Sequence, residues 1–180
     1  QRLAIDQLHI LGDIYDRGPG AHVIMDTMER YHSWDIQWGN HDVEWMGAAS
    51  GNSALVCSAL RSAFGYNNFD VLEDGYGINL RPISMFAARV YKDDPCTRFK
   101  PHLLDKNIYD AVEPTLAAKM HKAIAIIMFK LDGNMIKAHP EYHMEERLVL
   151  EKIDYKRGVI CLNGKEYPLR DSYFPTIDPK

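Results

Sequence analysis

Two short apolar runs that each end at a glycine constrain the fold of this chain most. The first, "LHIL", stops at Gly12 and Asp13, and the second, "WDIQW", stops at Gly39 and Asn40. Between them, apolar residues recur at helical spacing, so the pattern predicts a β-α-β unit. Two parallel strands joined in this way have their carboxyl ends at one edge of the sheet, where ligand crevices form in open α/β folds. We therefore expect the two glycine-ended motifs to meet there.

Asp13 and Asn40 are the candidate metal ligands at this edge. A carboxylate at a strand end can bridge two divalent cations held roughly 3.5–4 Å apart, as in two-metal hydrolases. Asn40 can offer its amide oxygen to one of them. This combination of oxygen ligands suits hard or borderline cations such as Mn²⁺, Mg²⁺ or Fe²⁺. The sequence therefore predicts a site for divalent metal ions.

Three further residues indicate what chemistry such a site performs. Asp16 can accept an N–H from the ring of His41, which fixes the imidazole tautomer and makes the pair a candidate proton donor. Arg17 presents a planar fork of donors that matches phosphate oxygens. Together with the metal ligands, these residues predict phosphoester hydrolysis. The simpler alternative is a surface loop with an Asx turn and a salt bridge, but such a loop has no need of the facing Asn-His-Asp cluster.

A second histidine pair offers a weaker metal hypothesis. His139 and His143 are four residues apart, a spacing that would bring them onto one helical face. Pro140 suggests a helix start between them, and no third ligand is evident. Tryptophans 34, 38 and 45 are most simply explained as core or rim packing around the strand.

The rest of the sequence predicts a helical segment followed by hairpins. Residues 46–130 show mostly helical spacing, interrupted by a polar stretch at 92–107 that suits either an exposed connection or a mobile lid. The run "IAIIMFKL" is expected to leave a helix and enter a hairpin at Asp132-Gly133, with "NMIKAH" as the returning strand. A second hairpin is predicted for "VICL" and "KEYPL", joined by Asn163-Gly164 in a type I′ turn.

Composition narrows the classes of partner. With 180 residues, of which 46% are apolar, the chain can bury a core and forms one large domain or part of one. A net charge of −4 gives no broad attraction to nucleic acid or anionic membrane. Three cysteines in no paired motif, and a start without the zones of a signal peptide, favour the reducing cytoplasm. The sequence begins without Met, so we expect it to lie within a longer protein.

The two motifs together resemble a known family. "GDIYDRG" and "GNHD" are similar to the second and third signatures of the calcineurin-like metallophosphoesterases. The longer stretches "LHILGDIYDRGPG", "DIQWGNHDVEWMGAASGN" and "LNGKEYPLRDSYFPTIDPK" resemble class III fructose-1,6-bisphosphatase. The resemblance implies mixed sheets flanked by helices and two divalent ions, with Mn²⁺ foremost. It also implies a bridging Asp13, a metal-binding Asn40, a general acid His41 backed by Asp16, and an Arg17 that touches phosphate.

The chain also departs from the family pattern. The first signature, a strand-end Asp-x-His, is absent, and so are the later histidine ligands, since His139 is followed by proline. We therefore expect an internal fragment that is inactive alone. It would be a partial metallophosphoesterase domain over 1–180, with a β-α-β metal-site core (1–45), a mostly helical insertion (46–130) and a hairpin region (131–180).

The function expected is hydrolysis of fructose 1,6-bisphosphate to fructose 6-phosphate and phosphate, for gluconeogenesis. The substrate would be a small sugar bisphosphate, with no nucleic acid or membrane partner, and the oligomeric state stays open. A phosphoprotein or dinucleotide phosphatase with the same site is one alternative, and a non-catalytic fragment that binds a partner through its helices is another. A bisphosphate needs a second cationic anchor, for which the candidates are Arg61, Arg81 and Arg89.

Overall fold

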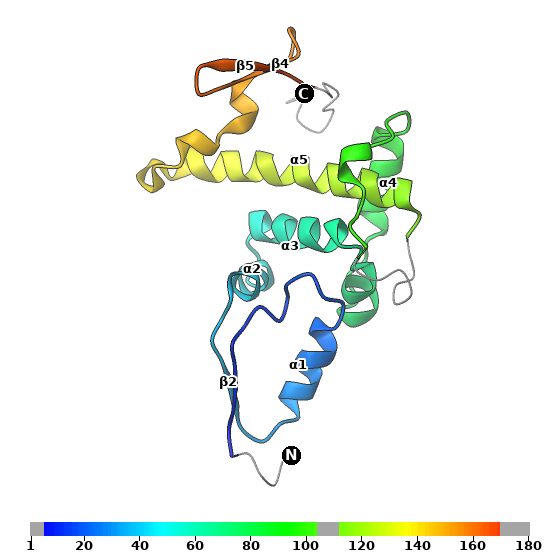
Figure 1. Cartoon of the computed structure of the whole chain (residues 1–180), viewed down its shortest axis with the longest axis vertical. Coiled ribbons are helices and arrows are strands. Elements are labelled where there is room, and N and C mark those ends of the chain that lie inside the picture. The colour runs from blue at the N-terminus through cyan, green and yellow to red at the C-terminus, as the bar shows by residue number, and fades with distance from the viewer. Residues whose placement is uncertain (1–5, 104–111, 170–180) are drawn as a thin grey trace.

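The computed structural model describes residues 6–103 and 112–169. Strands β1 (Leu8–Ile10) and β2 (Trp34–Ile36) form a two-stranded parallel sheet, and helix α1 (Ala21–Glu29) connects them (Figure 1). Leu8 lies opposite Trp34, and Ile10 lies opposite Ile36. The predicted β-α-β unit is confirmed, and both carboxyl ends lie at the same edge because the strands are parallel.

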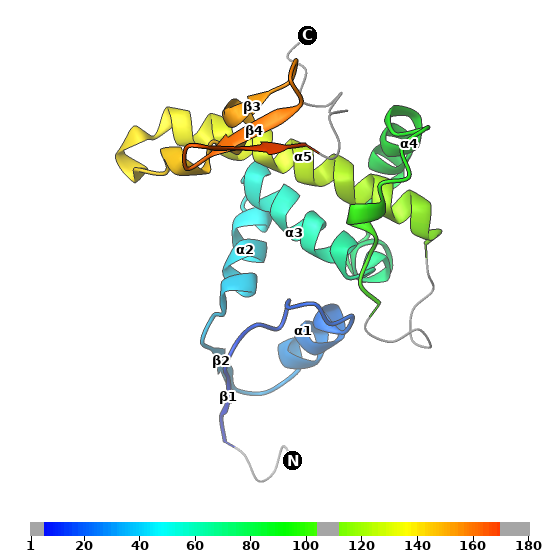
Figure 2. The same ribbon diagram turned by 45° about the horizontal axis from the view of Figure 1, so that its top comes forward.

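A group of helices follows the sheet. Helix α2 (Asn40–Ala49) runs from the end of β2 to helix α3 (Ser53–Gly65) (Figure 2). Next come a π-helical turn (Val71–Gly75), helix α4 (Arg81–Val90) and a 3-10 turn (Thr97–Phe99). The long helix α5 (Pro114–Ala138) then crosses α3 and α4. The chain is thus α/β, with a small sheet at one end and a helical body at the other.

Local sequence signals fix where the helices begin. The side chain of Asn52 accepts hydrogen bonds from the N–H groups of Ala54 and Leu55, each at 3.1 Å, and so caps α3. Glu113 caps α5 in the same way, and Pro114 occupies its first position, where no N–H is needed.

The hydrophobic core lies among α3, α4, α5 and the segment that joins α3 to α4. Phe64 and Phe69 stack within it, with ring centroids 5.0 Å apart. Its largest fully buried apolar side chains are Phe64, Phe69, Leu72, Tyr91 and Met120. Among the residues that the structure describes, no helix is both long and apolar enough to cross a membrane.

The hairpin predicted at Asp132-Gly133 is wrong, because α5 continues through both residues to Ala138. The run 123–126 is buried at four consecutive positions, since α5 is covered on several sides by α3, α4 and the 3-10 turn. A helix buried in this way loses its polar stripe, and its continuous apolar run then looks like a buried strand.

The polar stretch 92–107 is not simply an exposed connection. Lys122 of α5 is fully buried, and its ammonium group lies 2.5 Å from Oδ2 of Asp94. Cys96 is also buried, and its N–H donates to Oδ1 of Asp94 at 2.8 Å. This stretch therefore packs against α5 between Asp94 and Phe99, where His121 of α5 also contacts the Phe99 carbonyl, and its last four residues lie outside the described part.

The carboxyl-terminal region ends in a small antiparallel sheet. Three 3-10 turns (Pro140–Tyr142, Glu145–Arg147 and Val149–Lys152) lead to strands β3 (Ile153–Asp154), β4 (Val159–Leu162) and β5 (Lys165–Pro168). Asn163 and Gly164 have φ angles of 50° and 75°, as a type I′ turn requires. The second predicted hairpin is confirmed. Arg157 and Glu166 brace it with two hydrogen bonds of 2.7 and 2.6 Å.

Candidate active site

Two glycines allow the loops that follow β1 and β2 to touch. A Cβ atom on Gly12 would lie 2.3 Å from the carbonyl oxygen of Gln37, and one on Gly39 would lie 2.0 Å from Oδ1 of Asp13. Gly12 also has a φ of +86°, which side chains disfavour. Glycine is therefore required at both strand ends to bring the two motifs into contact.

Asp42 ties the two loops together. Its side chain is buried and accepts hydrogen bonds from the N–H groups of Asp13 (2.6 Å), Ile14 (2.9 Å) and Gly39 (2.9 Å). The bond to Gly39 satisfies a free N–H at the start of α2. Sequence analysis assigned Asp42 no role of its own, although an acidic residue three positions after a helix-starting glycine is the signal for such a cap.

The structure brings the candidate metal ligands Asp13 and Asn40 together. Oδ1 of Asp13 accepts the N–H of His41 at 3.2 Å, so the carboxylate lies at the first turn of α2, where Asn40 is the first residue. Asp13 has a φ of +50°, an uncommon conformation for a residue with a side chain. Asn40 makes no side-chain hydrogen bond to any other described residue, so its amide oxygen is available.

These two side chains fit part of a site for a hard divalent cation. One carboxylate and one neutral amide oxygen are suitable ligands, and the strained backbone at Asp13 is typical of a functional position. Over residues 6–103 and 112–169, no group of three or more His, Cys, Asp or Glu side chains could hold a metal ion. The described residues therefore offer at most part of a ligand set.

His41 lies between two carboxylates. Its Nε2 atom lies 3.0 Å from Oδ1 of Asp16, and its Nδ1 atom lies 3.7 Å from Oε2 of Glu44, which is too far for a hydrogen bond. The close approach of Nε2 to Asp16 is an ion-pair contact and not an aligned hydrogen bond, because Oδ1 of Asp16 has no hydrogen-bond partner among the described residues. The structure thus places the predicted Asp-His pair together, whereas Glu44 was not anticipated from the sequence.

Arg17 contacts the turn that follows helix α3. Its Nε atom lies 3.1 Å from Oδ1 of Asp16, and its guanidinium group lies 5.3 Å from the ring centroid of Tyr66. Its backbone has a φ of +56°, and its carbonyl oxygen accepts a hydrogen bond of 2.7 Å from the buried amide of Asn68. No local motif indicates these contacts, because Tyr66 and Asn68 come from a turn that is distant in the chain.

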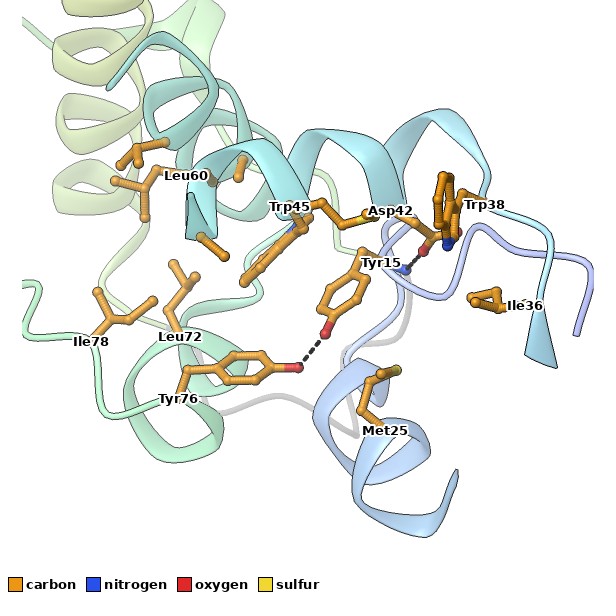
Figure 3. Close-up of a pocket in the computed structure, with 15 residues that line it drawn as sticks. Tyr15, Met25, Ile36, Trp38, Asp42, Trp45, Leu60, Leu72, Tyr76 and Ile78 are labelled. Carbon is orange, nitrogen blue, oxygen red and sulfur yellow. Dashed lines mark hydrogen bonds between the residues drawn. The ribbon is translucent and has the colours of Figure 1, made fainter. Parts of the chain in front are cut away.

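Two hollows adjoin these loops, and they differ in character. The larger, about 530 Å³, lies beside α2 and is mostly apolar, as Figure 3 shows. In it Tyr15 stacks on Trp45 at 4.7 Å and shares a 2.8 Å hydrogen bond with Tyr76. Burial, aided by that bond, raises the pKa of Tyr76. Such walls do not suit a phosphate ester. Trp38, by contrast, is 62% exposed and lies at the rim.

The smaller hollow is a groove of about 340 Å³ between α2 and α3, lined by both polar and apolar side chains. We call it the His41 groove; its lining includes Asn40, His41, Glu44, Arg61 and Ser62. It contains both a candidate metal ligand and the candidate proton donor. Its size and polarity match a small anionic ligand.

The second histidine pair does not form a site. His139 ends α5, with Nδ1 2.9 Å from a carboxylate oxygen of Glu141 and its ring stacked on Tyr142. His143 follows a single 3-10 turn in a left-handed conformation. Pro140 therefore starts no helix that could align the two rings.

Comparison with known proteins shows the family of the chain. Residues 1–180 match the family described as Firmicute fructose-1,6-bisphosphatase, and the chain belongs to that family. It is 55% identical to the class 3 fructose-1,6-bisphosphatase of Clostridium novyi (strain NT) and 58% identical to that of Bacteroides fragilis (strain YCH46). The protein of the same name from Listeria monocytogenes serovar 1/2a is 55% identical.

These matches cover 99–100% of this chain but only 27–28% of each relative. The chain thus spans a little over a quarter of the length of the curated relatives. No solved structure matches it.

Proposed function

We propose that this chain is the central part of a longer metal-dependent phosphatase that hydrolyses fructose 1,6-bisphosphate to fructose 6-phosphate and phosphate. We refer to that longer protein as the full-length protein. The observation that carries the proposal is the contact between Asp16 and His41, beside Asp13 and Asn40, at one edge of a parallel sheet. Family membership and the names of the relatives support the choice of substrate.

Asp13 and Asn40 would hold metal in this enzyme. We propose two divalent ions, with Mn²⁺ as the preferred one, because the oxygen ligands suit it. When bound, the ions supply Lewis acidity and an activated water molecule for attack on phosphorus. The remaining ligands would come from parts of the full-length protein outside this chain, on a calcineurin-like fold of mixed sheets flanked by helices.

Arg17 would bind the phosphoryl group that is transferred. More than half of its side chain is exposed, so the guanidinium group can reach a ligand while Asp16 and Tyr66 limit its orientation. Its planar donors match two phosphate oxygens and stabilise the charge that builds on them as the ester bond breaks. Arg17 is therefore the proposed substrate-binding cation.

His41 would protonate the departing sugar oxygen. Asp16 lies beside Nε2 at 3.0 Å, so we assign the transferred proton to Nδ1, the other ring nitrogen of a residue that lines the His41 groove. The water that attacks phosphorus replaces the C1–O oxygen, and the proton from His41 leaves that oxygen as a neutral hydroxyl of fructose 6-phosphate. Asp16 stabilises the imidazolium before transfer.

A substrate panel tests this function. The full-length protein, purified with Mn²⁺, should hydrolyse fructose 1,6-bisphosphate with a higher kcat/KM than it shows for phosphopeptides or dinucleotides. Equal efficiency on a phosphopeptide would reject the sugar substrate and retain the phosphatase. No turnover of any phosphomonoester would reject both, and would favour a non-catalytic role. The three cysteines are all free, which agrees with the cytoplasmic location that we propose.

A further inference from the structure

A bisphosphate substrate needs a cationic group for the phosphate that does not react, and the sequence offers Arg61, Arg81 and Arg89. Arg81 and Arg89 lie at the two ends of α4 and are exposed. In both views α4 lies well away from α2, beyond α3 and α5 (Figures 1 and 2). Of the three, Arg61 lines the His41 groove together with Asn40 and His41.

Arg61 has a charge that no described partner neutralises at close range. Its Nε atom is buried and has no hydrogen-bond partner within the described residues, which also provide no carboxylate within 4 Å of the guanidinium group. Asp132 of α5 lies within electrostatic reach of Arg61. Burial raises the pKa of Asp132, and Arg147 and Arg61 oppose that rise. A buried guanidinium nitrogen without a partner costs free energy, unless a ligand supplies an acceptor.

Arg61 shares the groove with the residues proposed to take part in the reaction. Arg61 lies on α3, across the groove from the first turn of α2, which carries Asn40 and His41. Helices α2 and α3 approach closely at Gly47, where a Cβ atom would lie 2.1 Å from Leu55. The groove wall is therefore formed by two packed helices, which fix the backbone that carries Arg61.

Glu44 is the one acidic side chain that lines this groove. Its carboxylate faces Nδ1 of His41 at 3.7 Å, so its charge is placed beside the imidazole. An anionic group bound at Arg61 would lie against the α3 wall, which also carries the hydroxyl group of Ser62. The Arg61 charge would attract a phosphate to the α3 wall, and the Glu44 carboxylate would keep that phosphate away from its own position on α2.

We propose that Arg61 binds the non-reacting phosphate of the bisphosphate and is therefore a specificity-determining residue. This inference rests on the proposed function, since it assumes that the reacting phosphate lies at Asp13, Asn40 and Arg17. Arg61 would bind equally in the ground state and the transition state, because its phosphate does not change during the reaction. Its loss should therefore raise KM and leave kcat nearly unchanged.

The test compares two substrates of the full-length protein, fructose 1,6-bisphosphate and fructose 1-phosphate. Arg61→Met removes the charge and keeps an unbranched side chain. We expect KM for the bisphosphate to rise roughly 10- to 100-fold, the effect of losing hydrogen bonds to a charged group, whereas KM for the monophosphate should not change. Arg89→Met, on the exposed end of α4, is the matched control and should affect neither substrate.

Three results are informative. Equal KM changes for both substrates, or none for the bisphosphate, would overturn the role of Arg61 while turnover of fructose 1,6-bisphosphate still supported the proposed function. If Arg61→Met does not fold, Arg61→Lys keeps the charge and decides the question: a smaller rise in KM confined to the bisphosphate supports the proposal, and an unchanged KM contradicts it. Absence of bisphosphatase activity in the unmodified protein would reject the proposed function itself.

Discussion

Nε2 of His41 lies 3.0 Å from Oδ1 of Asp16, which places a carboxylate beside the imidazole that lines the groove. Asp16→Asn should keep the ring in place but weaken its orientation and the stabilisation of the imidazolium. We expect kcat for fructose 1,6-bisphosphate to fall roughly 10- to 100-fold, with bound metal unchanged. The loss should be much smaller for p-nitrophenyl phosphate, whose leaving group needs no proton. An equal loss on both substrates would argue against a role in proton donation.

Asp42 should be as important for the site as the residues that carry the chemistry. Asp42→Ala would leave the N–H groups of Asp13, Ile14 and Gly39 without their acceptor, at a cost of about 2–3 kcal/mol in unfolding free energy. The Asp13 loop would also move, so metal content should fall. Asp42→Asn keeps one acceptor oxygen and should be milder. Thermal unfolding and metal analysis of the two full-length variants check this order, and equal effects would contradict it.

Asn68 should act on phosphate binding through Arg17. Asn68→Ala removes the 2.7 Å hydrogen bond to the Arg17 carbonyl, which helps to hold a backbone with positive φ. We expect inhibition by inorganic phosphate to weaken roughly tenfold, equivalent to one hydrogen bond. Tyr66→Leu removes only the partly exposed contact with the guanidinium group and should have a smaller effect. Unchanged phosphate inhibition in Asn68→Ala would show that this brace is unnecessary.

Removal of Asp94 and removal of Lys122 should cost different amounts of unfolding free energy, although the two residues form one ion pair. Burial alone would raise the pKa of Asp94, but the hydrogen bonds from Lys122 and Cys96 lower it overall. The Lys122 side chain is fully buried, whereas that of Asp94 is 20% exposed and can still reach water. Asp94→Ala removes the carboxylate that faces a fully buried ammonium group and should cost about 3–5 kcal/mol. Lys122→Met should cost clearly less, as measured by thermal unfolding; the reverse order would show that Asp94 is the more confined partner.

Local signals in the sequence predicted much of the fold. The β-α-β unit and the Asn163-Gly164 hairpin follow from short apolar runs and from turn residues that lie next to each other in the chain. The middle of α5 was misjudged, since burial on several sides erased the polar stripe by which a helix is recognised. The packing of 92–103 was missed because it depends on Asp94 meeting Lys122, which is 28 residues away.

In the candidate site, too, the residues that sequence predicted lie in local motifs, and those it missed depend on contacts between distant segments. Asp13, Asp16, Arg17, Asn40 and His41 belong to two compact motifs, so their types and spacing were readable. Glu44, Arg61 and Asn68 line or brace the site only because α2 and α3 fold back beside the loops. Arg61 was one of three equivalent arginines until the helices were placed, and only the fold separates it from Arg81 and Arg89.

The central claim is that Asp13 binds metal while His41 supplies a proton, and one paired measurement tests it most directly. Asp13→Asn and His41→Asn are made in the full-length protein, and bound Mn²⁺ and kcat for fructose 1,6-bisphosphate are measured on the same samples. We expect Asp13→Asn to lose metal and turnover together. His41→Asn should keep its metal while kcat falls by about 10²–10⁴, the contribution of a positioned proton donor. Full metal content in Asp13→Asn, or a normal kcat in His41→Asn, would contradict the account.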